Sequence, residues 1–327
     1  MGGGAWTRET YDRVTANKVR SGKAFSYTRD AIRSGRYEAH DGLKVLDKDG
    51  RPFTRESRDS EEHPESTPIV IGFDVTGSMG DNPQILQQAL KGLFGMLVRK
   101  GVASDPQVAI AGYGDTECDR VPLQLSQFES DNRIDDNLDN VFVERGGGGN
   151  HGEMSTALAW FVANHVETDA WQKRGKRGYM FLIGDECALP VSRGESHRFL
   201  GENQPHEITP EEAFAAAREK WDTYFLLVDN YAARFQHSRE KYARLLGEDH
   251  VIVLETTESA PAVIASVIGM AEETVDAGTL ATDLVDAGFD LAVAKAATKA
   301  TNGLDRRGAA RGGEMAKADT GYADLGL

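Results

Sequence analysis

Short apolar runs recur along the middle of the chain, separated by longer segments in which apolar residues follow a helical period. The run Ile69-Val70-Ile71-Gly72-Phe73 has no polar alternation, which is typical of a strand buried on both faces of a parallel sheet. The segment 121–125 alternates and contains Pro122, so we expect it at a sheet edge. The predicted strands are 69–73, 108–111, 121–125, 179–183, 224–228 and 251–254.

Between the apolar runs, the spacing of leucine, isoleucine and alanine predicts helices. Pro83 and Pro210 stand near helix starts, where proline fits the first turn. Strands that alternate with helices imply right-handed crossovers. We therefore predict an α/β fold with a doubly wound, mostly parallel sheet of Rossmann-like type and helices on both faces. The predicted helices are 83–97, 133–141, 154–166, one beginning near 210, 232–246, 260–274 and 278–300.

The pattern divides the chain into three parts. Residues 1–65 are polar and form an expected N-terminal arm, basic at first and acidic later. Residues 66–300 carry the α/β domain, and residues 301–327 lack periodicity, so we expect a flexible, disordered tail. The basic part of the arm is either a solvated helix face or a docking segment for an acidic surface.

Composition narrows the class of protein. The 327 residues are 40% apolar and 27% charged, as in ordinary globular proteins. A formal charge of −15 disfavours nucleic-acid binding, because an acidic chain repels phosphate backbones. Two cysteines do not make a disulfide framework, so we expect a cytoplasmic location. No apolar run approaches the roughly 18 residues of a membrane span, and we expect no membrane contact.

Oxygen-bearing side chains follow the predicted strands. Asp74, Thr76 and Ser78 alternate directly after the first strand, and Asp185 follows the strand that ends at residue 183. Because ligands of open α/β sheets bind beyond the carboxyl ends of the strands, we expect these side chains to meet. Hard oxygen ligands suit Mg²⁺ or Mn²⁺. A glycine-rich segment, 146–153, opens a predicted helix between the two loops.

Over residues 66–275 the chain resembles the von Willebrand factor A (VWA) family and its metal-ion-dependent adhesion site (MIDAS). Asp74, Thr76 and Ser78 match the family's first motif, and Asp185 matches its last. The resemblance implies a divalent cation, held directly or through water, whose coordination is completed by a carboxylate of a partner protein. Intracellular members often work beside AAA+ ATPases, which makes such an ATPase one expected partner.

The middle loop departs from the family pattern, because no threonine follows its glycines. Either Glu153 or Asn150 takes the place of the family ligand, or neither does. An extra carboxylate there would strengthen metal binding and weaken the attraction for a partner's acid. Another loop, 112–119, follows a strand at the same edge, and its Asp115 is either part of a polar turn or of the partner surface. The long loop 189–208 leaves the same edge and could shape the partner's footprint.

Three alternatives use the same residues. In a haloacid-dehalogenase-type phosphohydrolase, Asp74 would be the nucleophile, but the late motif lacks a second aspartate after Asp185. A nucleotide site at the G-x-G-x-x-G pattern would need a strand at 141–143 before it. The third is a metal-free VWA scaffold. We predict a metal-dependent protein-interaction module rather than an enzyme.

Overall fold

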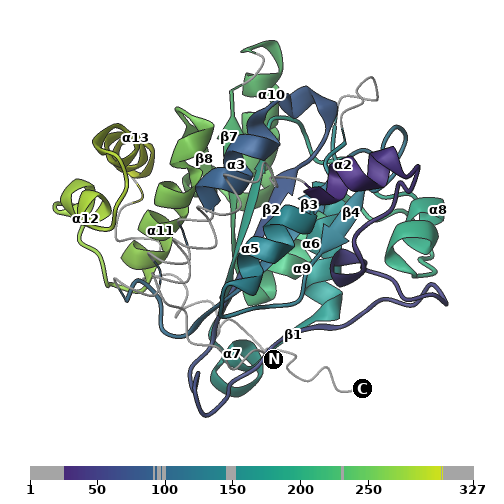
Figure 1. Cartoon of the computed structure of the whole chain (residues 1–327), viewed down its shortest axis with the longest axis horizontal. Helices are drawn as coiled ribbons and strands as arrows, with labels where there is room; N and C mark the ends of the chain where they lie inside the picture. The colour runs from purple at the N-terminus through teal and green to yellow at the C-terminus, as the bar shows by residue number, and fades with distance from the viewer. Residues whose placement is uncertain are drawn as a thin grey trace, which may run out of the picture.

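A computed structural model of the chain describes residues 26–90, 93, 97, 101–144, 152–229, 232–302 and 304. Its centre is a six-stranded sheet with strand order β4-β3-β2-β6-β7-β8 (Figure 1). All neighbours pair in parallel except β4, which lies antiparallel to β3 at the edge. The predicted fold class and the edge position of residues 121–125 are confirmed. The strands are β2 Thr67–Asp74, β3 Pro106–Tyr113, β4 Leu123–Leu125, β6 Gly178–Gly184, β7 Trp221–Val228 and β8 Val251–Leu254.

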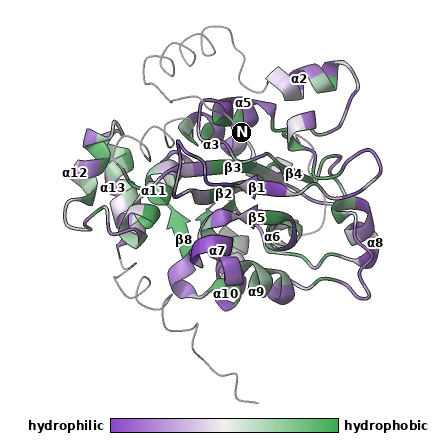
Figure 2. Cartoon of the chain, turned by 90° about the horizontal axis from the view of Figure 1, so that it is seen from below, coloured by the Kyte–Doolittle hydropathy of each residue, from purple (hydrophilic) through white to green (hydrophobic). Residues whose placement is uncertain are grey.

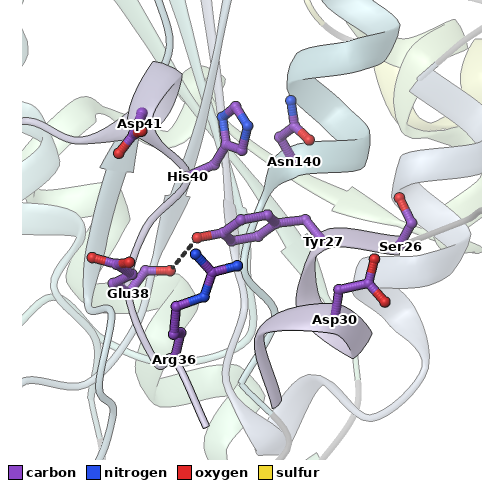
Figure 3. Close-up of a pocket in the computed structure, with 8 residues that line it drawn as sticks. All are labelled: Ser26, Tyr27, Asp30, Arg36, Glu38, His40, Asp41 and Asn140. Carbon is purple, nitrogen blue, oxygen red and sulfur yellow. Dashed lines mark hydrogen bonds between the residues drawn. The ribbon is translucent and has the colours of Figure 1, made fainter. Parts of the chain in front are cut away.

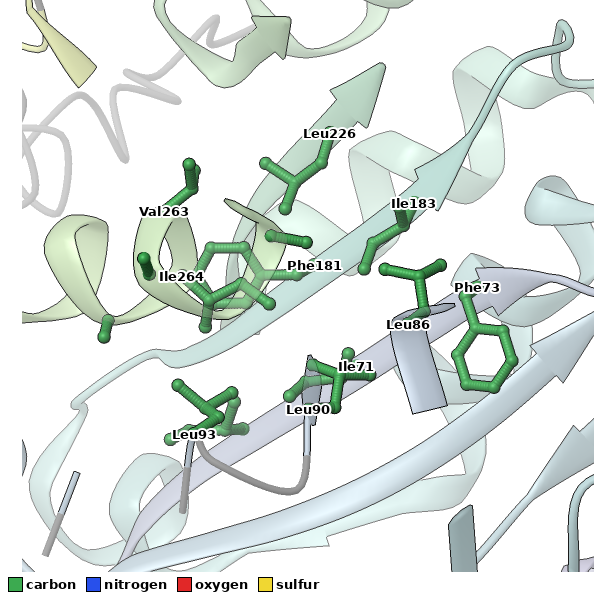
Figure 4. Packing of buried hydrophobic residues seen from close by; sticks show 14 of the residues in the cluster. Ile71, Phe73, Leu86, Leu90, Leu93, Phe181, Ile183, Leu226, Val263 and Ile264 are labelled. Atoms are coloured by element: carbon green, nitrogen blue, oxygen red, sulfur yellow. The ribbon is translucent and has the colours of Figure 1, made fainter. Parts of the chain in front are cut away.

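Helices cover both faces of this sheet (Figure 2). The face that carries Ile71 and Phe73 packs against five helices in one apolar cluster, part of which Figure 4 shows. These are α3 Asn82–Leu90, α5 Arg133–Asn140, α11 Ala260–Ala271, α12 Leu280–Asp286 and α13 Leu291–Thr301. The opposite face, which carries Val70, packs against α6, α9 and α10. Their bounds are α6 Ser155–His165, α9 Pro210–Lys220 and α10 Ala232–Leu246.

Strand β2 explains why the sheet is covered on both sides. All eight of its residues are buried, and successive side chains point to opposite faces. Ile69, Ile71 and Phe73 belong to one apolar cluster and Val70 belongs to the other. Gly72 lets α6 approach, because a Cβ at this position would lie 2.5 Å from Leu158 Cδ2. The central strand is therefore fixed tightly, and its carboxyl end with it.

Residues 26–66 run along the body of the domain. They contain α2 Ser26–Arg33, the 3₁₀ turn η1 Asp41–Leu43 and strand β1 Arg55–Ser57. Strand β1 pairs in parallel with β5 Val166–Thr168 to form a separate two-stranded sheet. Helix α7 Asp169–Arg174 follows β5 directly. The basic residues 1–25 of the expected arm and residues 305–327 of the expected tail lie outside the described residues.

Residues 141–143 do not form a strand. Side chains satisfy their backbone instead. The Thr28 hydroxyl donates to the Val141 carbonyl at 3.1 Å and accepts from the Val143 amide at 3.0 Å. The Gln124 amide group bonds both the amide and the carbonyl of Phe142. A nucleotide site at the glycine-rich segment would need a strand at residues 141–143, and these residues do not form one.

The long C-terminal helix expected over 278–300 is two helices, α12 and α13. Gly288 lies between them with φ of +103°, a conformation that side-chain-bearing residues rarely adopt. Short elements complete the fold. They are η2 Gly77–Met79, α8 Arg193–Glu195, the π-helical turn η3 Ser196–Leu200, η4 Glu248–His250 and η5 Thr257–Ser259.

Candidate metal site

The loop after β2 brings the first three predicted ligands together. The Asp74 side chain is completely buried, and its Oδ1 accepts the backbone N–H of Thr76 at 2.7 Å. The single 3₁₀ turn η2 then folds the chain back, so that the hydroxyls of Thr76 and Ser78 lie 2.8 Å apart. The Ser78 hydroxyl also reaches Asp185 Oδ1 at 3.4 Å. Asp74, Thr76, Ser78 and Asp185 thus converge at the carboxyl edge of the sheet.

Glu153 is held beside these residues by backbone hydrogen bonds on both sides. Its N–H donates to the Cys187 carbonyl at 2.8 Å, and its carbonyl accepts the Leu189 N–H at 3.1 Å. The next amide, that of Met154, donates to the Gly114 carbonyl at 3.0 Å. Glu153 therefore lies between the loops that follow β3 and β6. Asn150, the other candidate for this ligand position, lies outside the described residues.

Close packing fixes the approach to Glu153. A Cβ on Gly152 would lie 2.5 Å from the Leu189 side chain and 2.8 Å from the Cys187 carbonyl oxygen. Any larger residue at position 152 would therefore push the loop after β6 away. The glycine at this position has a structural reason that the sequence pattern alone did not reveal.

Two of the buried carboxyl groups of the site, Asp74 and Glu153, have raised pKa values. Burial raises the pKa of Asp74 well above its usual value, and the nearby Asp185 carboxylate raises it further. Burial likewise raises the pKa of Glu153 to about 11, with Asp74 and Glu186 adding to the effect. Like charges that share a buried site repel one another unless a cation lies between them.

The donor set fits a divalent cation. Asp74 Oδ2 and Glu153 Oε2 are both buried, and neither has a hydrogen-bond partner in the part of the chain that the structure describes. Buried polar atoms in folded proteins are nearly always paired, so two orphaned carboxylate oxygens at one edge call for a ligand. With the two hydroxyls, the donors are hard oxygens of the kind that Mg²⁺ and Mn²⁺ bind.

The hydroxyls are essential to this interpretation. Within the described ranges, no group of three or more His, Cys, Asp or Glu side chains is arranged to hold a metal ion by itself. A cation at this edge would therefore depend on Thr76 and Ser78 as well as on the carboxylates. The structure brings five of the predicted residues together: Asp74, Thr76, Ser78, Glu153 and Asp185.

The loop after β3 forms a turn next to the site. Asp115 Oδ1 accepts the Glu117 N–H at 2.8 Å, and the Asp115 N–H donates to Asp119 Oδ2 at 2.7 Å. Burial raises the pKa of Asp119 to about 7. The Thr116 hydroxyl bonds the Glu195 carboxylate, which joins this turn to the long loop 189–208. Asp115 therefore has a local structural role in shaping the turn.

The two cysteines differ in environment. Cys118 is exposed on the same turn, and Cys187 is buried within the loop after β6. The Cys187 thiol lies 3.5 Å from the Ser238 hydroxyl of α10. Ser238 and Tyr242, one helical turn apart, are not predictable as neighbours of the site, because polar residues on an amphipathic helix give no signal of what they contact.

A surface pocket of about 370 Å³ lies between α2, η1 and the end of α5 (Figure 3). Three of its acidic side chains, Asp30, Glu38 and Asp41, already have basic neighbours. Lys44 pairs with Glu38 at 3.3 Å and with Asp41 at 2.7 Å, and Arg33 pairs with Asp30 at 2.7 Å. The Tyr27 hydroxyl donates to the Glu38 carbonyl at 3.0 Å. We assign no ligand to this pocket, which shares no residue with the carboxyl-edge site.

No family model and no curated protein matches the sequence. Solved structures of similar shape include the pilus adhesin SpaC from Lactobacillus rhamnosus GG, at 10% identity and a TM-score of 0.44. The match covers 67% of this chain and 31% of SpaC. The vWF domain of the type V pili tip protein Mfa5 from Porphyromonas gingivalis matches at 12% identity, a TM-score of 0.40 and coverage of 63% and 95%.

A third similar structure is proximal thread matrix protein 1 from the mussel byssus, described with a zinc-occupied MIDAS motif. It matches at 14% identity and a TM-score of 0.40, over 63% of this chain and 46% of its own length. The chain therefore spans less than half of this protein and less than a third of SpaC. Among the described helices, none has the length and apolar character needed to cross a bilayer.

Proposed function

We propose that this chain is a VWA-type protein-interaction module that grips a partner protein through a divalent cation, Mg²⁺ or Mn²⁺, at the carboxyl edge of its sheet. The observation that carries the proposal is the pair of orphaned, buried oxygens, Asp74 Oδ2 and Glu153 Oε2. Leaving two such atoms without partners is costly in a folded protein, and a cation between them would remove that cost.

Five side chains would hold the cation: Asp74, Thr76, Ser78, Glu153 and Asp185. When bound, it would supply an open coordination position to an oxygen of the partner. Asp74 fixes the turn by accepting the Thr76 N–H, so that both hydroxyls face the same point. Ser78 is half-buried while Asp74 and Thr76 are buried, so the Ser78 side of the site lies nearest the surface.

The partner is expected to offer a carboxylate, and an AAA+ ATPase is one class to test. A cytoplasmic site of action belongs to the proposal and is supported only by the low cysteine content. The acidic net charge supports a protein partner over a nucleic acid.

Burial of Asp74 weighs against the phosphohydrolase alternative. A nucleophilic aspartate must be ionised and reachable by phosphorus. Here the Asp74 side chain is 0% exposed, and burial together with Asp185 raises its pKa. A metal-free scaffold is the remaining alternative, and metal titration separates it from the proposal.

The test is calorimetric titration of the full chain with Mg²⁺ and Mn²⁺. We expect one site in the wild type and no measurable binding in Asp74→Asn, which removes a charge but keeps the side-chain shape. Asp222→Asn is the matched control, since Asp222 pairs with Arg177 at the other end of β7 and should bind metal normally. A wild-type chain that binds neither ion at millimolar concentration contradicts the proposal. A pull-down from the native cell, with metal against chelator, then identifies the partner.

A further inference from the structure

Helix α10 contacts the loop that carries Asp185 and the first residue of α6, which lies two residues beyond Glu153. Two of its buried residues, Ser238 and Tyr242, lie one helical turn apart on the same face. The Ser238 hydroxyl donates to the backbone carbonyl of Asp185 at 3.1 Å. The Tyr242 hydroxyl shares a hydrogen bond of 2.8 Å with the hydroxyl of Ser155, the first residue of α6.

The Ser238 hydroxyl donates its hydrogen bond outside its own helix rather than within it. A serine inside a helix commonly bonds the carbonyl one turn back in its own helix. Ser266 of α11 does so, donating to the Ala262 carbonyl at 2.6 Å. Ser238 instead donates out of its helix to Asp185, and its oxygen also lies 3.5 Å from the Cys187 thiol. The hydroxyl therefore anchors the loop after β6 on both sides of Glu186.

Packing around the aromatic ring fixes the orientation of the Tyr242 side chain. The ring stacks on Phe225 of β7 with an interplanar angle of 12° and meets Phe214 of α9 edge-on at 88°. The whole side chain is 0% exposed, so its hydroxyl has one direction in which to point. That direction leads to Ser155, two residues beyond Glu153 in the chain.

The two anchored loops are also joined to each other. The Glu153 N–H donates to the Cys187 carbonyl, and Leu189 donates back to the Glu153 carbonyl. Ser238 and Tyr242 thus hold a unit that contains Asp185 at one end and Glu153 at the other. A helix that grips both ends of this unit sets the separation between the two carboxylates.

We propose that Ser238 and Tyr242 are positioning residues for the cation, and that α10 sets the distance between Asp185 and Glu153. This inference rests on the proposed function. Groups that orient metal ligands without touching the metal typically change affinity by about 10–100-fold when removed. Because binding free energies are reciprocal, an occupied site would in turn hold α10 more rigidly.

The experiment measures Mn²⁺ affinity of full-chain variants by electron paramagnetic resonance. Ser238→Ala and Tyr242→Phe each remove one hydroxyl, and Tyr242→Phe keeps the ring stack on Phe225. We expect each to weaken Mn²⁺ binding about 10-fold, and Ser238→Thr, which keeps a hydroxyl, to recover most of the loss. Ser266→Ala is the buried control and His237→Ala is the exposed control on α10, and both should bind like the wild type.

A second readout separates positioning from stability. Mn²⁺ should slow amide hydrogen exchange in α10 of the wild type, and Ser238→Ala should lose that protection while its metal-free melting temperature matches that of Ser266→Ala. Wild-type affinity in both Ser238→Ala and Tyr242→Phe overturns the inference and leaves the proposed function standing. A wild-type chain that binds no Mn²⁺ overturns both. If Ser238→Ala does not fold, the Tyr242→Phe result decides.

Discussion

Acidic side chains at the two ends of the central sheet differ in whether they have basic partners. Near the amino end of β2, acids in and beside the small β1–β5 sheet have basic partners. Arg58 binds Glu56, Glu167 and Asp169, and Arg174 binds Asp59. At the carboxyl ends, Asp74 and Glu153 are buried, and no ion pair among the described side chains reaches either of them.

The pKa values of the carboxyl groups at the two ends reflect this difference. Burial alone would raise the pKa of Asp59, but hydrogen bonds from Arg174 and Ser66 outweigh it and lower the pKa to about 2. Burial and like charges raise the pKa of Glu153 to about 11. Acids with basic partners stay ionised in the folded protein, whereas the buried acids at the carboxyl ends are neutralised by protons or by a bound cation. The contrast is the basis for proposing a functional site at the carboxyl edge and a stabilising role for the ion pairs at the other.

The substitution Glu153→Gln tests this difference most directly. Removing this carboxylate should weaken Mg²⁺ binding about 100-fold, since a direct ligand contributes more than the 10–100-fold of groups behind it. The metal-free stability near neutral pH should rise, because glutamine is neutral in both states, whereas Glu153 with its raised pKa must take up a proton when the chain folds. Calorimetric titration and urea unfolding measure the two quantities.

A Glu153→Gln protein that binds Mg²⁺ as tightly as the wild type would remove Glu153 from the site. The ligand position would then fall to Asn150 or to no residue of the middle loop.

At the opposite end, Arg58→Met should destabilise the fold without affecting metal binding. Arg58 is one-quarter exposed, and Asp169 behind it is almost fully buried. Losing the arginine would leave that carboxylate with Lys173 as its remaining basic partner, and we expect a loss of about 1 kcal/mol, at the upper end of the values for surface pairs. Urea unfolding measures the loss.

Arg33→Met is the matched control, because Arg33 pairs with Asp30 in a fully exposed position and should cost less than about 0.5 kcal/mol. Equal losses from the two variants would show that the amino-end cluster is no more than a set of surface pairs.

The smallest expected effect is on the pH dependence of folding stability, to which the two ends contribute with opposite sign. Asp59 has a folded pKa below its unfolded value of about 3.9, so its stabilisation disappears as the pH falls from about 4 to 2. Asp74 and Glu153 have folded pKa values above their unfolded values, so the metal-free protein loses stability as the pH rises above about 4.5.

In chelator, the melting temperature should therefore fall by about 3 °C or more between pH 5 and 8, a shift that corresponds to about 1 kcal/mol. Excess Mg²⁺ should remove that fall, because the ion replaces the protons. A melting temperature that stays level over this range in chelator would contradict the raised acidities at the carboxyl edge.

Long elements with a clear apolar period were predictable from the sequence. Helix α10 and strand β8 begin and end where the pattern placed them, and the oxygen-rich loops after β2 and β6 meet as parallel-sheet geometry requires. Apolar burial dominates such elements, so a local pattern is enough to find them.

Elements that depend on a distant partner were not predictable. Strands β1 and β5 have three residues each, and Arg-Glu-Ser and Val-Glu-Thr carry no apolar period. Residues 141–143 look like a strand but are held by Thr28 and Gln124, two side chains far away in sequence. The role of Ser238 behind Asp185 likewise depends on a contact across 53 positions.

Pairing of β1 with β5 has a consequence for how the protein is made. Arg55 aligns with Val166, so β1 leaves the ribosome well before the strand that completes it. At about 5–20 residues per second, synthesis of the intervening segment takes roughly 6–20 s. During that interval Arg58 and Asp59 have neither Asp169 nor Arg174 to bind. The ion pairs of Arg58 with Asp169 and of Arg174 with Asp59 therefore form only after β2 and β3 have been synthesised. By then the first strands of the central sheet already exist.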